Sequence, residues 1–158
     1  MIFNPPFASI PFQATENLKA SFEDYKGKWL VLYFYPKDAT PGCTTQGQDF
    51  RDQYINFKSL NTEIFGISRD TLDSHNKFKG NQKFPFELIT DTQEMLCQAF
   101  DVIKMKSMYG KQVRGIERST FIIDPKGALR HEWRKVRVPG HVAKVLATLK
   151  ELQLSSLS

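Results

Sequence analysis

Apolar residues along the chain fall into short continuous runs and into stripes with helical spacing. The longest run covers residues 29–35, seven consecutive apolar residues that predict a strand buried on both faces. A break with two prolines and a glycine follows, and then Phe50, Tyr54 and Phe57 recur at helical spacing. This spacing predicts a helix from Thr44 onward, directly after the strand.

The same patterns predict an alternation of strands and helices over the rest of the chain. Strands are expected within 63–68, 84–89, 120–123 and 128–133, and helices are expected to open near Asp70 or Thr71, near Asp91 or Thr92, and after Gly140. Strands alternating with helices predict an α/β fold whose sheet is covered by helices on both faces. We find no linker or internal repeat, so residues 1–158 are expected to form a single domain.

One of only two cysteines stands at the turn between the first predicted strand and its helix. Cys43 would lie in the first helical turn, where unpaired backbone N–H groups and the positive end of the helix dipole favour a thiolate. The position therefore favours a reactive sulfur. By position alone, a small buried hydrophobic residue is the alternative interpretation.

The residues around Cys43 extend this picture. The segment YFYPKDATPGCTT places Pro36, Thr40 and Cys43 in the spacing Pro-x-x-x-Thr-x-x-Cys, and GIERSTFIID brings Arg118 to the mouth of another predicted strand. With these motifs the chain resembles the peroxiredoxins, in particular the bacterioferritin comigratory protein or peroxiredoxin Q subfamily, over nearly its whole length after the first two dozen residues. The resemblance implies a thioredoxin-like fold with a central mixed sheet.

The resemblance also implies an activity and a set of roles. It implies a thiol peroxidase in which Cys43 attacks the peroxide while Thr40 and Arg118 hold its two oxygens. Pro36 would shield the sulfur, and backbone N–H groups near Gly42 would be further donors. The resemblance implies a peroxide substrate, a thioredoxin or glutathione with glutaredoxin as reductant, and no cofactor or metal.

The sequence departs from its relatives where the oxidised cysteine would be resolved. Much of this subfamily has a second cysteine five residues after the first, and here that residue is Gln48; the common glutamate three residues after the cysteine is Gln46. Only Cys97 remains, in a predicted helix with apolar neighbours. Three alternatives stay open for Cys97: an inert buried thiol, a resolving cysteine, or a partner in an intermolecular disulfide.

Charge is distributed unevenly along the chain. Residues 1–100 carry a net charge of −2 and residues 101–158 a net charge of +7, for a total of +5. The basic residues are scattered among predicted strands and turns without a nucleic-acid-binding motif, so a solvated basic face that helps acidic partners dock is favoured over a nucleic-acid site. No apolar stretch reaches the roughly 18 residues of a membrane helix. We expect a cytoplasmic protein, monomeric or weakly dimeric, that binds neither nucleic acid nor membrane.

Other functions are less consistent with the sequence. The absence of a Cys-x-x-Cys motif argues against a disulfide oxidoreductase, and no glycine-rich phosphate loop is present. His75, His131 and His141 lie far apart in the sequence without a nearby cluster of cysteines or carboxylates, so no metal site is expected. A redox-sensing or chaperone-like protein on the same fold is the alternative to the enzyme.

Overall fold

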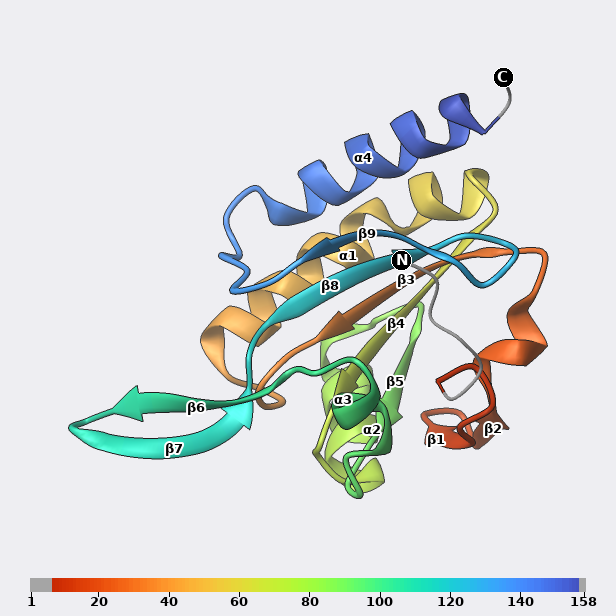
Figure 1. Ribbon diagram of the computed structural model, residues 1–158. Helices are drawn as coiled ribbons and strands as arrows, with labels where there is room; N and C mark the ends of the chain where they lie inside the picture. The colour runs from red at the N-terminus through yellow and green to blue at the C-terminus, as the bar shows by residue number, and fades with distance from the viewer. Residues whose placement is uncertain (1–6, 157–158) are drawn as a thin grey trace.

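The computed structural model describes residues 7–156, which form a seven-stranded mixed sheet, a separate two-stranded sheet and flanking helices (Figure 1). In chain order the elements are β1 (Phe12–Ala14), β2 (Leu18–Ala20), η1 (Phe22–Tyr25), β3 (Trp29–Phe34), α1 (Pro41–Ser59), β4 (Thr62–Ser68), α2 (Leu72–Gln82), β5 (Glu87–Thr90), α3 (Met95–Ala99), β6 (Ile103–Met108), β7 (Lys111–Ile116), β8 (Ser119–Ile123), β9 (Leu129–Trp133) and α4 (His141–Ser155). The expected alternation of strands and helices is confirmed.

The large sheet has the strand order β2-β1-β5-β4-β3-β8-β9. Strands β3, β4 and β5 run parallel, and the outer pairs are antiparallel, so the sheet is mixed as predicted. Strand β3 lies between β4 and β8, and all six of its residues are buried. This burial on both faces explains why its sequence is continuously apolar rather than alternating.

Alternate residues of β3 belong to two different hydrophobic clusters, one on each face of the sheet. Val31 and Tyr33 belong to a cluster with apolar residues of α1, α2 and α4. Leu30 and Leu32 belong to the opposite cluster, which receives α3, η1 and the described N-terminal residues from Phe7. Helices α1 and α4 lie side by side over the first face (Figure 1).

The third helix begins later than its sequence predicts. Helix α3 starts at Met95 rather than at Asp91 or Thr92. The Asp91 carboxylate nevertheless accepts hydrogen bonds from the backbone N–H groups of Leu96 at 3.1 Å and Cys97 at 2.8 Å. Asp91, which precedes this short helix, therefore accepts hydrogen bonds from N–H groups that have no acceptor within the helix.

Strands β6 and β7 form a hairpin that projects from the body, and the hydrophobic pattern did not predict it (Figure 1). Its Met105, Met108 and Tyr109 are exposed, so no buried face imposes an alternating pattern.

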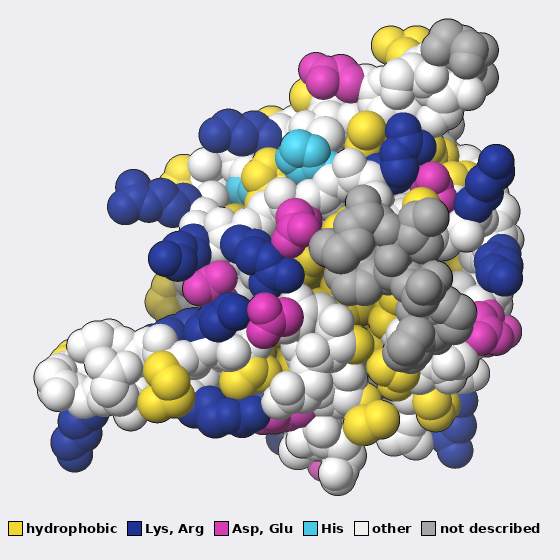
Figure 2. All heavy atoms as spheres, in the orientation of Figure 1, with side chains coloured by type: hydrophobic (Ala, Val, Ile, Leu, Met, Phe, Trp, Pro, Cys, Tyr) yellow, Lys and Arg dark blue, Asp and Glu magenta, His cyan; other side chains and the backbone are white. Residues whose placement is uncertain are grey.

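Figure 2 shows Lys and Arg side chains on and beside this hairpin, together with Asp and Glu. Pairs in this region include Lys104–Asp101, Arg114–Glu94 and Arg134–Glu132. Neighbouring carboxylates thus balance part of the positive charge of residues 101–158. This agrees with the interpretation of the basic residues as a solvated face.

No helix within residues 7–156 has the length and apolar character needed to cross a membrane.

The first residue of α4 makes the stability of the fold depend on pH. His141 is buried, with Nε2 2.8 Å from the Thr120 hydroxyl; burial, helped by the charges of Lys144 and Arg118, lowers its pKa from 6.5 to about 4. Between the two pKa values, about 4 and 6.5, the unfolded chain therefore binds more protons than the folded one. Stability is lost as pH falls toward about 4, by about 2 kcal/mol from this group between pH 7 and pH 4.5.

Urea unfolding of the wild type and of His141→Asn at these two pH values measures this contribution. Asparagine does not titrate, so the variant should lose less stability on acidification than the wild type. Equal losses in the two proteins would show that His141 is not the responsible group.

Candidate active site

The Cys43 sulfur is placed by the strand, loop and helix that precede and contain it. Strand β3 ends at Phe34, and α1 begins at Pro41, three residues earlier than the predicted start at Thr44. Proline suits this first helical position because an N–H group there would have no acceptor within the helix, so its absence costs no hydrogen bond. Cys43 is the third residue of α1 and only 2% exposed, so the sulfur lies in the first turn, as predicted.

Arg118 reaches Cys43 from the segment that leads into β8. Its Nη2 lies 3.4 Å from Cys43 Sγ, and its Nη1 donates a hydrogen bond to Gln46 Oε1 at 2.5 Å. The two branches of the guanidinium therefore hold different partners. Among residues 7–156, Arg118 forms no ion pair with a carboxylate, and the nearby Asp124 pairs with Arg130. The positive charge of Arg118 thus acts on the sulfur without a neutralising anion.

The remaining predicted site residues lie in the same loop and helix start. Thr40 directs its hydroxyl hydrogen to the carbonyl of Lys37 at 2.8 Å, so its oxygen lone pairs remain free to accept. Pro36 is half-buried just after β3. At Gly42 a Cβ would lie 3.3 Å from Arg118 Nη2, so the absence of a side chain leaves room for the guanidinium.

Gln46 completes the contacts around Arg118. It is fully buried one turn after Cys43, and its Nε2 has no hydrogen-bond partner among the described residues. The neutral amide orients Arg118 without cancelling its charge, whereas a glutamate there would form an ion pair with it.

Cys97 lies on the other side of the sheet from Cys43. It is 0% exposed and packs in the cluster with Leu96, whereas Cys43 packs in the cluster of α1 and α4. Burial, followed by the charge of Asp91, raises the pKa of the Cys97 thiol well above its ordinary value. Both cysteines are free. A disulfide between them would require the chain to open, because its Cα atoms must come within about 7 Å.

Known proteins resemble this chain in sequence and in architecture. A model of the AhpC/TSA family matches residues 6–132. The chain belongs to the AhpC/TSA family. It is 50% identical to peroxiredoxin Bcp of Xanthomonas campestris over 141 residues, covering 89% of this chain and 88% of that one. It is 53% identical to peroxiredoxin Bcp of Bacillus subtilis over 137 residues, covering 87% and 86%.

Solved structures agree with these relatives. A variant of peroxiredoxin Q from Xylella fastidiosa superposes with a TM-score of 0.93 at 43% identity, covering 97% of this chain and 95% of that one. The X. campestris bacterioferritin comigratory protein, studied for its alkyl peroxide reduction activity, superposes with a TM-score of 0.88 at 48% identity, covering 92% of each chain. The chain is thus a peroxiredoxin, a thiol peroxidase with the expected thioredoxin-like fold.

Gln48, five residues after Cys43, takes part in the packing of α1 against α2. Its Nε2 donates to Gln82 Oε1 at 2.8 Å, and Arg51 Nη1 donates to the Gln82 carbonyl at 2.9 Å. These bonds join α1 to the end of α2. Position 48 therefore stabilises the helix pair and offers no sulfur.

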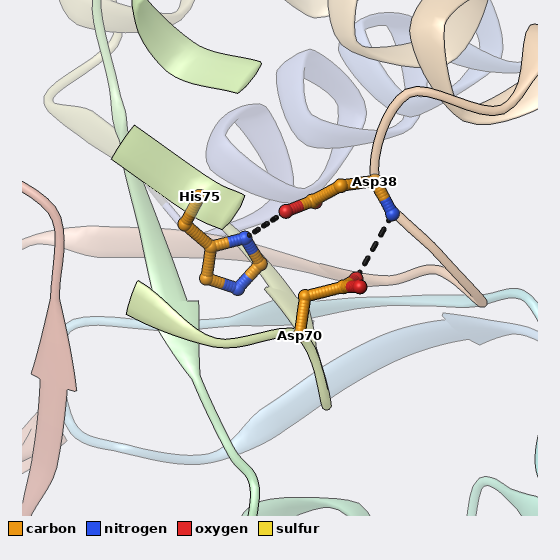
Figure 3. A group of neighbouring side chains, drawn as sticks. All are labelled: Asp38, Asp70 and His75. Carbon is orange, nitrogen blue, oxygen red and sulfur yellow. Dashed lines mark hydrogen bonds and ion pairs between the residues drawn. The ribbon is translucent and has the colours of Figure 1, made fainter. Parts of the chain in front are cut away.

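The sequence analysis, which found no cluster of cysteines or carboxylates near the histidines, missed one group of side chains. The fold of this peroxiredoxin brings Asp38, Asp70 and His75 together, with potential metal-ligand atoms within 4.8 Å of one another (Figure 3). However, hydrogen bonds already engage these atoms: Asp38 Oδ1 accepts from Tyr35 Oη, and Asp70 Oδ2 from the Ser68 hydroxyl. A metal ion would have to displace these donors, so we interpret the group as a hydrogen-bonded network.

Proposed function

We propose that this peroxiredoxin reduces hydroperoxides by attack of the Cys43 sulfur on the peroxide. The contact of Arg118 Nη2 with Cys43 Sγ at 3.4 Å carries the proposal, because it sets a fixed charge beside a sulfur at a helix start. An S–O bond forms as the O–O bond breaks, and sulfur gives up two electrons. The leaving oxygen takes the bonding pair and a proton, which yields an alcohol or water and a sulfenic acid on Cys43.

The surrounding groups support this step in different ways. Arg118 stabilises the charge that develops on the peroxide oxygens. Thr40 accepts the hydrogen of the peroxide, because its own hydrogen is bound to the Lys37 carbonyl. The backbone N–H groups of Gly42 and Cys43 lie in the first helical turn, where they lack acceptors within the helix. Pro36, half-buried just after β3, is the residue that we propose to shield the sulfur.

Alkyl hydroperoxides are the proposed substrates, together with hydrogen peroxide. The support is the alkyl peroxide reduction activity studied in the X. campestris relative, which is 48% identical to this chain. Cys43 attacks an oxygen that both kinds of peroxide possess.

An external thiol is the proposed reductant of the sulfenic acid. A first thiol condenses with the sulfenic acid to form a mixed disulfide and water, and a second thiol releases Cys43 as a disulfide leaves. The burial of Cys97 on the opposite face and the presence of Gln48 favour this route. Glutathione, alone or with a glutaredoxin, should support turnover at least as well as thioredoxin.

The Cys97→Ala variant tests this route. We expect its first oxidation, and its turnover with glutathione, to proceed at the wild-type rate, because Cys97 takes no part in either. Mass analysis of the wild type should show sulfinic acid on Cys43 at modest peroxide excess without reductant. Rapid thioredoxin-driven turnover that disappears in Cys97→Ala would instead make Cys97 a resolving cysteine.

Steady-state peroxide consumption tests the function as a whole. With excess glutathione or dithiothreitol, an enzyme consumes many equivalents of peroxide per chain. A single stoichiometric oxidation under the same conditions would contradict the enzyme and support the alternative, a redox-sensing protein.

The proposal also covers the cellular compartment and the oligomeric state of the protein. Two free cysteines on opposite faces of the sheet suit a reducing compartment, so we place the protein in the cytoplasm. We propose a monomer or weak homodimer without nucleic-acid or membrane partners.

A further inference from the structure

A buried network joins the loop before Cys43 to helix α2 (Figure 3). Asp38 lies in this loop, between β3 and α1, and is 6% exposed. Its Oδ1 accepts from Tyr35 Oη at 2.6 Å, and its Oδ2 accepts from Ser74 Oγ at 2.8 Å and lies 2.7 Å from His75 Nδ1. Its backbone N–H donates to Asp70 Oδ2 at 2.9 Å. Side chain and main chain of Asp38 are thus fixed together.

The two ring nitrogens of His75 contact two different parts of the fold. Its ring is 0% exposed, and Nε2 lies 3.0 Å from the carbonyl of Ile89, which can only accept. Nε2 therefore carries a hydrogen. Nδ1 faces a carboxylate oxygen of Asp38 at 2.7 Å, within hydrogen-bond distance. His75 thereby connects the loop to β5.

The loop held by this network adopts a conformation that its residues do not favour. Ala39 has φ 61°, in the left-handed region, where a Cβ approaches the following carbonyl oxygen. Thr40 follows as the N-cap of α1 and makes no side-chain capping bond. Two local hydrogen bonds, from Thr40 Oγ to the Lys37 carbonyl and from Tyr35 Oη to Asp38, span this turn. The contacts of Asp38 with Asp70 and His75 add support from distant elements.

We propose that Asp38 and His75 are positioning residues that hold the loop before α1 so that Cys43 meets Arg118. The inference rests on the proposed role of Cys43. Asp38 is two residues before Thr40, whose carbonyl accepts the first helical bond from the Thr44 N–H at 2.8 Å. A shift of Asp38 is therefore passed directly to the helix start. Neither Asp38 nor His75 contacts Cys43, so they act through the loop.

Two substitutions of His75 test the proposal in the full chain. In His75→Asn the amide nitrogen can occupy the place of Nδ1 and still donate to Asp38, whereas His75→Leu removes both hydrogen bonds. The rate constant for oxidation of Cys43 by hydrogen peroxide is measured by rapid quenching and mass analysis. We expect His75→Leu to lower it about tenfold or more, because small misplacements of reacting groups slow reactions strongly. His75→Asn should recover most of the rate.

A matched control separates positioning from stability. Leu149→Ala opens a cavity in α4 outside the network and should destabilise the fold while leaving the oxidation rate unchanged at temperatures where the protein is folded. Reduction of oxidised Cys43 by dithiothreitol should proceed equally fast in the wild type and in His75→Leu, because the loop is not needed for that step.

Three outcomes would overturn the inference: His75→Leu oxidised at the wild-type rate, no recovery in His75→Asn, or an equal loss in Leu149→Ala. If His75→Leu does not fold, Asp38→Asn gives the same test, because it removes the charge from the pair and keeps the volume. The double variant Asp38→Asn/His75→Leu should be no slower than the slower single variant, as expected for residues that act together. A wild type whose Cys43 is not oxidised would refute the proposed function itself.

Discussion

A Cys43→Ser variant is expected to lose peroxide turnover entirely while keeping the fold. Serine has nearly the volume of cysteine and fits the site at the start of α1, but its hydroxyl is a far weaker nucleophile at neutral pH. Stopped-flow mixing with peroxide, with the unfolding midpoint measured in parallel, checks both parts. The matched control is Cys97→Ala, which should react as the wild type does. A Cys43→Ser protein that still consumed peroxide would place the reactive group elsewhere.

Replacing Arg118 with Met should slow the oxidation of Cys43 by about a hundredfold or more, the scale of losing one donor to a developing charge. Methionine keeps much of the length of the side chain but removes the charge and both donors. The rate constant for peroxide attack, measured under pseudo-first-order conditions, gives the effect.

Arg118→Lys is the informative companion variant. Lysine restores the charge, but a single ammonium cannot reproduce a fork that holds Gln46 Oε1 with one nitrogen and Cys43 Sγ with the other. We therefore expect only partial recovery. If Arg118→Met reacted as fast as the wild type, Arg118 would serve the structure alone, and the proposed geometry of attack would be wrong.

The elements that the sequence predicted are those with a strong periodic signal. Strand β3, helix α1 and helix α4 bury continuous apolar runs or stripes, so their patterns reflect their environment directly. The short hairpin of β1 and β2 escaped prediction because each strand has three residues. The β6–β7 hairpin escaped because both of its faces carry exposed side chains.

Prediction of the candidate site had the same limit. Residues close together in the sequence were recognised, whereas the sequence pattern alone did not show contacts between distant residues. The segment from Pro36 to Cys43 is continuous, so the sequence alone drew attention to it, and to Arg118 at the mouth of another strand. The resemblance then implied the roles of these residues. The Asp38–His75 contact joins residues 37 positions apart, and no local pattern marks it. Sequence distance led us to treat His75 as isolated, whereas the fold brings α2 against the loop that holds Asp38.

The contact between Cys43 and Arg118 spans 75 positions of the chain, which affects how the protein is made. Ribosomes add about 5–20 residues per second, so a gap of this length takes roughly 4–15 s to synthesise. During that interval the nascent chain contains the sulfur but not the guanidinium. Strand β8, which docks beside β3, follows directly after Arg118. On the role proposed for Arg118, the chain can reduce peroxide only after β8 has paired with β3, and an incomplete chain lacks the Cys43–Arg118 contact.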